Sequence, residues 1–132
     1  MTEVLRFRVE KLIRDKLPQI MRDAGLKVFD RRLEDAEFVQ SLKVKLGEET
    51  AEVAVATSAD EVLGELADVM EVVLALADAH GFTAVDLEAA RRAKFEERGG
   101  FTERVYNAAV EAEESCPAVA YYLARPEKYP RL

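Results

Sequence analysis

Five acidic side chains fall into two groups whose spacing suits a shared site on neighbouring helices. Glu48, Glu49 and Glu52 come first, and Glu65 and Asp68 follow after twelve intervening residues. Residues three or four positions apart lie side by side on a helix surface. An all-oxygen set of this kind suits Mg²⁺ or Mn²⁺, ions that usually complete their coordination with substrate phosphates. The spacing therefore indicates metal-assisted phosphate chemistry.

The segment around these acids contains no basic residue. Between Leu46 and Ala90 there are eleven Asp or Glu residues and no Lys or Arg, in a chain whose net charge is −7. Helices commonly offset their acids with bases three or four positions away. This segment does not, so we expect a divalent cation to neutralise it.

Both groups of acids interrupt an apolar helix face. At about 100° per residue, Glu49 falls inside the apolar stripe of a helix expected over roughly 36–57, and Glu65 falls inside the apolar arc of the next helix. A buried ionised carboxylate needs a partner. Neither helix has a base after Lys45, so we expect no protein cation near the acids. The alternative is an ordinary solvated face, as in most Glu-rich helices, and the pattern alone leaves both open.

The elements that would position these acids are helices with clear start and stop signals. Asp35 is the expected N-cap of the first long helix, and Ser58, with Glu61 three residues later, the expected capping box of the second. That second helix should end near Gly81, and Thr83 should cap a third that stops at Gly99-Gly100, after which Phe101 should return to the core. Shorter helices are expected over 18–24 and 108–114. The sequence thus predicts an all-α fold.

Length and composition set the broader class. The 132 residues are the size of one domain, and we expect a single domain over 1–132. No apolar run is long enough to cross a membrane and no signal peptide is recognisable. A single cysteine, Cys116, fits a reducing cytoplasm. The acidic balance argues against a nucleic acid polymer as partner.

The acidic motifs resemble a known family. Glu48-Glu49-Thr50-Ala51-Glu52 and Glu65-Leu66-Ala67-Asp68 are similar to the EExxE and ExxD motifs of the MazG-like all-α nucleotide pyrophosphohydrolases. The opening KLIRDKLP (11–18) resembles that of a house-cleaning, phosphoribosyl-ATP pyrophosphohydrolase-like subgroup, and Lys94 with the run Glu97–Phe101 resembles the family's basic element. The likeness covers about residues 11–107, leaving a tail at 115–132.

The resemblance implies a function and a set of residue roles. It implies Mg²⁺-dependent (or Mn²⁺-dependent) hydrolysis of a nucleoside triphosphate to the monophosphate and pyrophosphate, in a MazG-like helical bundle whose core is completed in a homodimer or homotetramer. Carried over by motif position, the metal ligands are Glu49, Glu52, Glu65 and Asp68. Glu48 is the catalytic residue beside them, as an outer ligand or a base that orients water. The phosphate-binding bases are Lys94, Arg98, Arg14 and Lys16.

Two other functions stay open at this point. The first is phosphoribosyl-ATP pyrophosphohydrolase activity in histidine biosynthesis, which would use the same metal site. The second is a non-catalytic regulatory module, although all four ligand positions are acidic here. A di-iron bundle requires Glu-x-x-His pairs. The one histidine is His80, and the residue three positions before it is Ala77 and not a glutamate, so this function is excluded.

Overall fold

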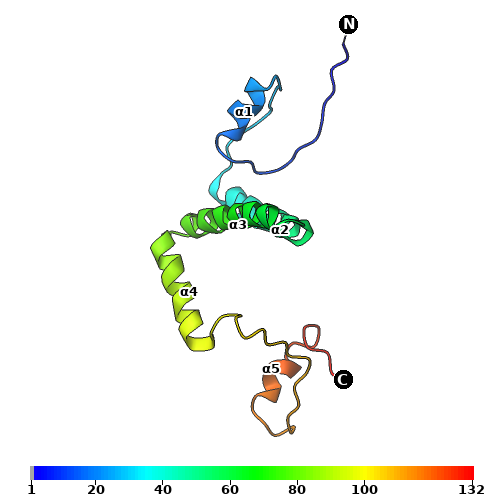
Figure 1. Cartoon of the computed structure of the whole chain (residues 1–132), viewed down its shortest axis with the longest axis vertical. Coiled ribbons are helices and arrows are strands. Elements are labelled where there is room, and N and C mark those ends of the chain that lie inside the picture. The colour runs from blue at the N-terminus through cyan, green and yellow to red at the C-terminus, as the bar shows by residue number, and fades with distance from the viewer. Residues whose placement is uncertain (1) are drawn as a thin grey trace. The chain divides into compact units, whose positions relative to one another are not determined.

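The regular structure of the protein consists of helices. The computed structural model describes residues 2–132, and within that range it contains no strand. The helices are α1 (Leu17–Asp23), α2 (Asp35–Val55), α3 (Ala59–Ala79), α4 (Ala84–Arg98) and α5 (Val119–Leu123) (Figure 1). The expected all-α fold is confirmed. In the same range, no helix is both long enough and apolar enough to span a bilayer.

The chain separates into two compact units. The first ends at Glu96, and the second is Glu97–Leu132. The first unit holds α1, α2, α3 and most of α4, together with both acidic motifs. The expectation of a single domain over 1–132 stays a prediction.

A hairpin of two long helices forms the centre of the first unit. Each of α2 and α3 has 21 residues, and only residues 56–58 separate them, so the two helices run antiparallel and side by side (Figure 1). They are the one pair of helices that pack against each other in the described range. Leu42 of α2 and Val72 of α3 are buried, at 3% and 8% exposure. This hairpin is the scaffold that holds the acidic residues.

Local hydrogen bonds define where α3 and α4 begin. The Ser58 hydroxyl accepts the backbone N–H of Glu61 (3.1 Å), as expected, but the Glu61 carboxylate accepts from Thr57 N (3.2 Å) rather than closing a box on Ser58. Thr83 and Asp86 form a reciprocal pair, with N···O distances of 2.8 and 3.1 Å. These caps satisfy N–H groups that a helix start leaves free.

Other helix ends differ from the sequence-based expectation. Asp35 is wrong as the N-cap of α2, because that position belongs to Glu34, whose carbonyl accepts Phe38 N at 2.8 Å while its side chain makes no capping bond. Asp35 instead lies in the first turn, where a carboxylate is favoured by the helix dipole. Gly81 and Gly99 follow α3 and α4 with φ of +83° and +78°, a left-handed backbone that glycine adopts without strain.

The second unit has little regular structure. Residues 108–114, expected to be helical, are not, since so short a segment gains little without packing. Phe101 is 96% exposed, so its expected return to the core is also wrong. The five-residue helix α5 was not expected. Its Tyr121 and Tyr122 pack against Tyr129 with ring centroids 5.9 and 5.0 Å apart, so the tail's aromatic rings pack on one another.

One face of α3 is apolar and is not covered by any other part of residues 2–132. Leu63, Leu66 and Met70 lie within about 60° of one another on the helix and are half or more exposed. They lie roughly opposite the buried Val72. We call these three residues the α3 stripe.

Candidate metal centre

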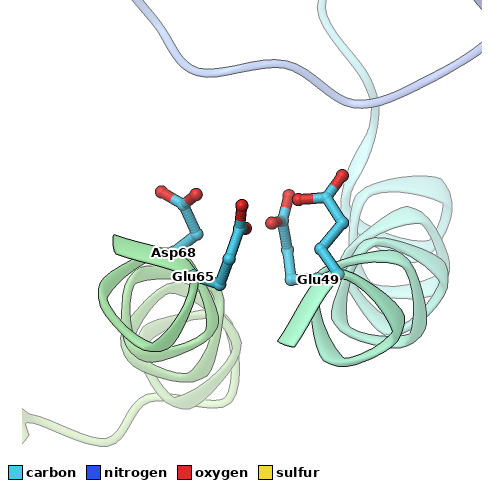
Figure 2. Close-up of side chains that lie close together, drawn as sticks. Glu49, Glu65 and Asp68 are labelled. Carbon is cyan, nitrogen blue, oxygen red and sulfur yellow. The ribbon is translucent and has the colours of Figure 1, made fainter. Parts of the chain in front are cut away.

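The carboxylates of both acidic motifs converge on one place in the hairpin. Glu49 and Glu52 project from α2, and Glu65 and Asp68 from α3, and one oxygen from each lies within 4.8 Å of the others. Figure 2 shows Glu65 and Asp68 on one helix facing Glu49 on the other. The sequence predicted that the two i, i+3 pairs of acids would converge on one point. They do so because the antiparallel hairpin places the two pairs at the same level along the helices.

Two oxygens of the cluster are buried without a partner. Glu49 is only 7% exposed, and its Oε2 atom accepts no hydrogen bond from the protein. The Oε2 atom of Glu65 is likewise buried and unpaired. A buried carboxylate oxygen without a donor is costly, by roughly 1–3 kcal/mol or more for a charged group. These two atoms need a positive partner that the hairpin does not supply.

Two protein cations lie at the edges of the cluster, so the expectation that none would be near is wrong. Lys45 Nζ is 3.4 Å from Glu48 Oε2 and 3.4 Å from Glu49 Oε1, and its side chain is only 21% exposed. Arg14 Nη2 donates to Asp68 Oδ1 at 2.6 Å. Neither cation reaches the two unpaired oxygens. The cluster is thus partly, but not fully, neutralised by the protein.

Burial dominates the titration of Glu49. Removal from water raises the pKa of the Glu49 carboxyl above its ordinary value, and the neighbouring Glu52 carboxylate raises it further. Lys45 acts in the opposite direction, lowering the pKa, but does not reverse the shift. Ionising Glu49 therefore costs more in the folded chain than ionising an ordinary carboxyl group, and a further cation would reduce that cost.

Without metal, the raised pKa of Glu49 should make the protein less stable as the pH rises, which is the reverse of the effect of a carboxyl group with a lowered pKa. Because the folded pKa of Glu49 is raised, the folded chain holds its proton more tightly than the unfolded chain does. Stability should therefore fall as the pH rises from the ordinary carboxyl pKa through the raised value, by at most about 1.4 kcal/mol per pH unit for one proton. Thermal melts in chelator from pH 4 upward should show this component in the wild type. It should be missing from Glu49→Gln, and the same pH slope in both proteins would contradict the assignment to Glu49.

The donor set fits a hard divalent cation. Four carboxylates from a rigid hairpin provide only oxygen atoms, which Mg²⁺ and Mn²⁺ prefer, and no Cys or His belongs to the cluster. The unpaired Oε2 atoms of Glu49 and Glu65 are the ones that an ion would satisfy. The cluster can therefore bind a divalent metal, and its identity as Mg²⁺ stays a prediction.

The structure places the other predicted residues in different surroundings. Glu48 is half-buried beside Lys45, next to the cluster. Lys16 precedes α1 as its N-cap residue and is exposed. Lys94 has an exposed side chain on α4, and Arg98, in the second unit, lies 3.8 Å from Glu97. The phosphate-binding roles of Lys16, Lys94 and Arg98 stay predictions.

Lys45 is the residue of this site that sequence reasoning missed. It stands three and four positions before Glu48 and Glu49, a spacing that places it on the same helix face as both. The i, i+3 and i, i+4 relation was sufficient to identify it as their counter-ion.

Comparison with known proteins assigns the family. The family model described as phosphoribosyl-ATP pyrophosphohydrolase matches residues 10–95, which is more than half of the chain and includes both acidic motifs. No curated protein and no solved structure gives a match. The matched range ends within α4, so the second unit lies beyond it. The chain therefore belongs to the phosphoribosyl-ATP pyrophosphohydrolase family, within the MazG-like superfamily of all-α nucleotide pyrophosphohydrolases.

Proposed function

We propose that this pyrophosphohydrolase cleaves nucleoside triphosphates between the α- and β-phosphates, using a divalent ion held by Glu49, Glu52, Glu65 and Asp68. The observation that carries the proposal is the convergence of the four carboxylates within 4.8 Å, two of them with buried oxygens that no protein group satisfies. The arrangement supports the proposal in one way: acidic side chains alone would repel a polyphosphate, and an intervening cation would make the two compatible.

Each residue near the cluster then has a distinct task. The ion, most simply Mg²⁺, would stabilise charge on the phosphates and promote attack by water. The four carboxylates hold it at a fixed level of the α2–α3 hairpin. Lys45 holds Glu48 at 3.4 Å, which fixes that carboxylate beside the cluster, where it can orient a water. Arg14 already contacts Asp68, so its guanidinium could bind a phosphate held at the cluster.

The preferred substrate is the finer part of the proposal. We propose a non-canonical or excess nucleoside triphosphate, and hence a house-cleaning role, because the KLIRDKLP opening resembles that subgroup. The second candidate is phosphoribosyl-ATP, which the description of the matching family favours. Both substrates carry the same triphosphate next to a ribose, so the metal cluster would serve either one.

A substrate panel distinguishes these two functions. The purified protein with Mg²⁺ should release pyrophosphate from at least one member of a panel of NTPs, dNTPs and oxidised nucleotides, at least tenfold faster than from phosphoribosyl-ATP. A preference of the same size for phosphoribosyl-ATP would establish the second candidate instead. No pyrophosphate from any member, in a preparation that is folded and binds Mn²⁺, would overturn the proposed activity. Orthophosphate release in place of pyrophosphate would show that a different bond is cut.

We also propose that a second copy of the chain completes the core. The α3 stripe of Leu63, Leu66 and Met70 is uncovered, with Met70 at 63% exposure, although α3 is the more apolar helix of the hairpin. Burying apolar surface stabilises by roughly 25 cal/mol per Å², so uncovered stripes favour association. A homodimer that pairs these stripes, or a tetramer built from two such dimers, would bury them while leaving each metal cluster within one hairpin.

A further inference from the structure

The contact between Arg14 and Asp68 joins two parts of the first unit that are 54 residues apart in sequence. Arg14 lies in the non-helical segment before α1, and its Nη2 atom donates to Asp68 Oδ1 at 2.6 Å. In Figure 2 the blue N-terminal segment crosses on the side toward which the carboxylate groups point. The two cations therefore contact the cluster from different elements, since Arg14 pairs with Asp68 of α3 and Lys45 pairs with Glu49 within α2.

The geometry of this ion pair makes it replaceable. It uses a single nitrogen and a single oxygen, and the two side chains are 57% and 41% exposed. Exposed ion pairs of this kind contribute roughly 0.2–1 kcal/mol. A divalent ion bound by the four carboxylates would attract Asp68 more strongly than one guanidinium does, and it would reduce the negative charge that holds Arg14 at the cluster. Metal binding should therefore loosen Arg14 from Asp68.

A released Arg14 would remain beside the carboxylate cluster, within reach of a phosphate bound to an ion there. Its guanidinium can form two parallel hydrogen bonds to a phosphate, which are stronger than its single bond to an exposed carboxylate. The same side chain would thus be attached to Asp68 in the ion-free protein and to substrate in the loaded protein.

We propose that Arg14 is a latch on the metal site: it holds Asp68 before the ion binds, gives up this carboxylate to the ion, and then binds the substrate phosphates. This inference depends on the proposed function, since it needs the ion and the phosphates at this cluster. It adds a linkage between them, in which Arg14 opposes metal binding alone and supports phosphate binding once the metal is present.

Two binding measurements on Arg14→Gln test the latch, and they should change in opposite directions. Mn²⁺ binding to the full chain without nucleotide, followed by the loss of the free-ion EPR signal, should become about two- to fivefold tighter, the fold-change that corresponds to an exposed ion pair. Binding of inorganic pyrophosphate in saturating Mg²⁺, followed by calorimetry, should become about tenfold weaker because a charge-assisted hydrogen bond is lost.

The matched control is Lys11→Gln, which removes the same charge from the same segment. Lys11 is exposed and forms no ion pair within residues 2–132, so both affinities should stay within about 1.5-fold of wild type. Arg14→Lys keeps the charge and should fall between wild type and Arg14→Gln. If Lys11→Gln increased the Mn²⁺ affinity as much as Arg14→Gln does, the increase would be due to the lower positive charge of the segment and not to loss of the Arg14–Asp68 pair.

The contrary results are distinct from failure of the proposed function. Unchanged or weaker Mn²⁺ binding by Arg14→Gln, with a wild type that binds Mn²⁺ normally, would overturn the latch alone and would make Arg14 a residue that merely orients Asp68. A wild type that binds no Mn²⁺, or whose Mn²⁺ binding is indifferent to Glu49→Gln, would instead remove the metal site itself.

Discussion

Glu49→Gln should lose about a thousandfold in turnover while keeping its helices intact. The substitution removes a ligand whose buried oxygen has no other partner, and a correctly held ion contributes several kcal/mol of transition-state stabilisation, at about 1.4 kcal/mol per factor of ten. Stability without metal should be unchanged or higher, because the raised pKa of Glu49 shows that ionising this carboxyl is unfavourable in the folded chain. Initial rates of pyrophosphate release, together with a thermal melt in chelator, measure both effects.

A matched variant separates the loss of a proposed metal ligand from the loss of one negative charge on the hairpin. Asp78 lies on the same helix as Asp68, is exposed and stands outside the cluster, so Asp78→Asn should keep wild-type turnover. Asp68→Asn should behave like Glu49→Gln. If Glu49→Gln kept near wild-type rates on the best substrate, the metal ligands would have to be sought elsewhere.

Met70→Glu should prevent assembly of the protein. Met70 is the last residue of the α3 stripe and is 63% exposed, and pairing of two such stripes would place the new carboxylates in an apolar interface without a partner. The cost of an uncompensated buried charge is several kcal/mol, so the dissociation constant should rise at least about a hundredfold. Light scattering after size exclusion, over a range of protein concentrations, reports the mass directly.

The conservative variant Met70→Leu provides the control. It keeps an apolar side chain of similar volume and should leave the mass and the melting temperature nearly unchanged. A wild-type protein that is monomeric at all concentrations, with a melting temperature that does not depend on concentration, would refute the proposed assembly. In that event the α3 stripe would not be buried by a second copy of the chain.

The parts of this fold that are predictable from sequence are those set by nearby residues. Two helix starts depend on hydrogen bonds between residues three positions apart. The structure contains both: the Ser58 hydroxyl accepts from Glu61 N, and the Thr83 hydroxyl accepts from Asp86 N. The placement of Glu49 on a buried face also follows from helical periodicity, which depends only on its neighbours. One more step, the closure of the hairpin, brings the two acidic pairs together.

The features that were not predictable depend on distant or weak interactions. Periodicity contains no information about the Arg14–Asp68 pair, because it joins a non-helical segment to a helix 54 residues later. In the second unit, residues 108–114 have helix-forming composition but no apolar face to bury, whereas the short α5 forms where Tyr121 and Tyr122 pack on Tyr129. Tertiary contacts rather than propensity decide such short elements.

The three-residue connection between α2 and α3 has a consequence for how the protein folds. All four candidate ligands lie between positions 49 and 68, so the polypeptide that brings them together closes only a short loop. Loop closure of this length has a small entropic cost, and local contacts of this kind form rapidly. The four candidate ligands should therefore come together early in the folding of the chain.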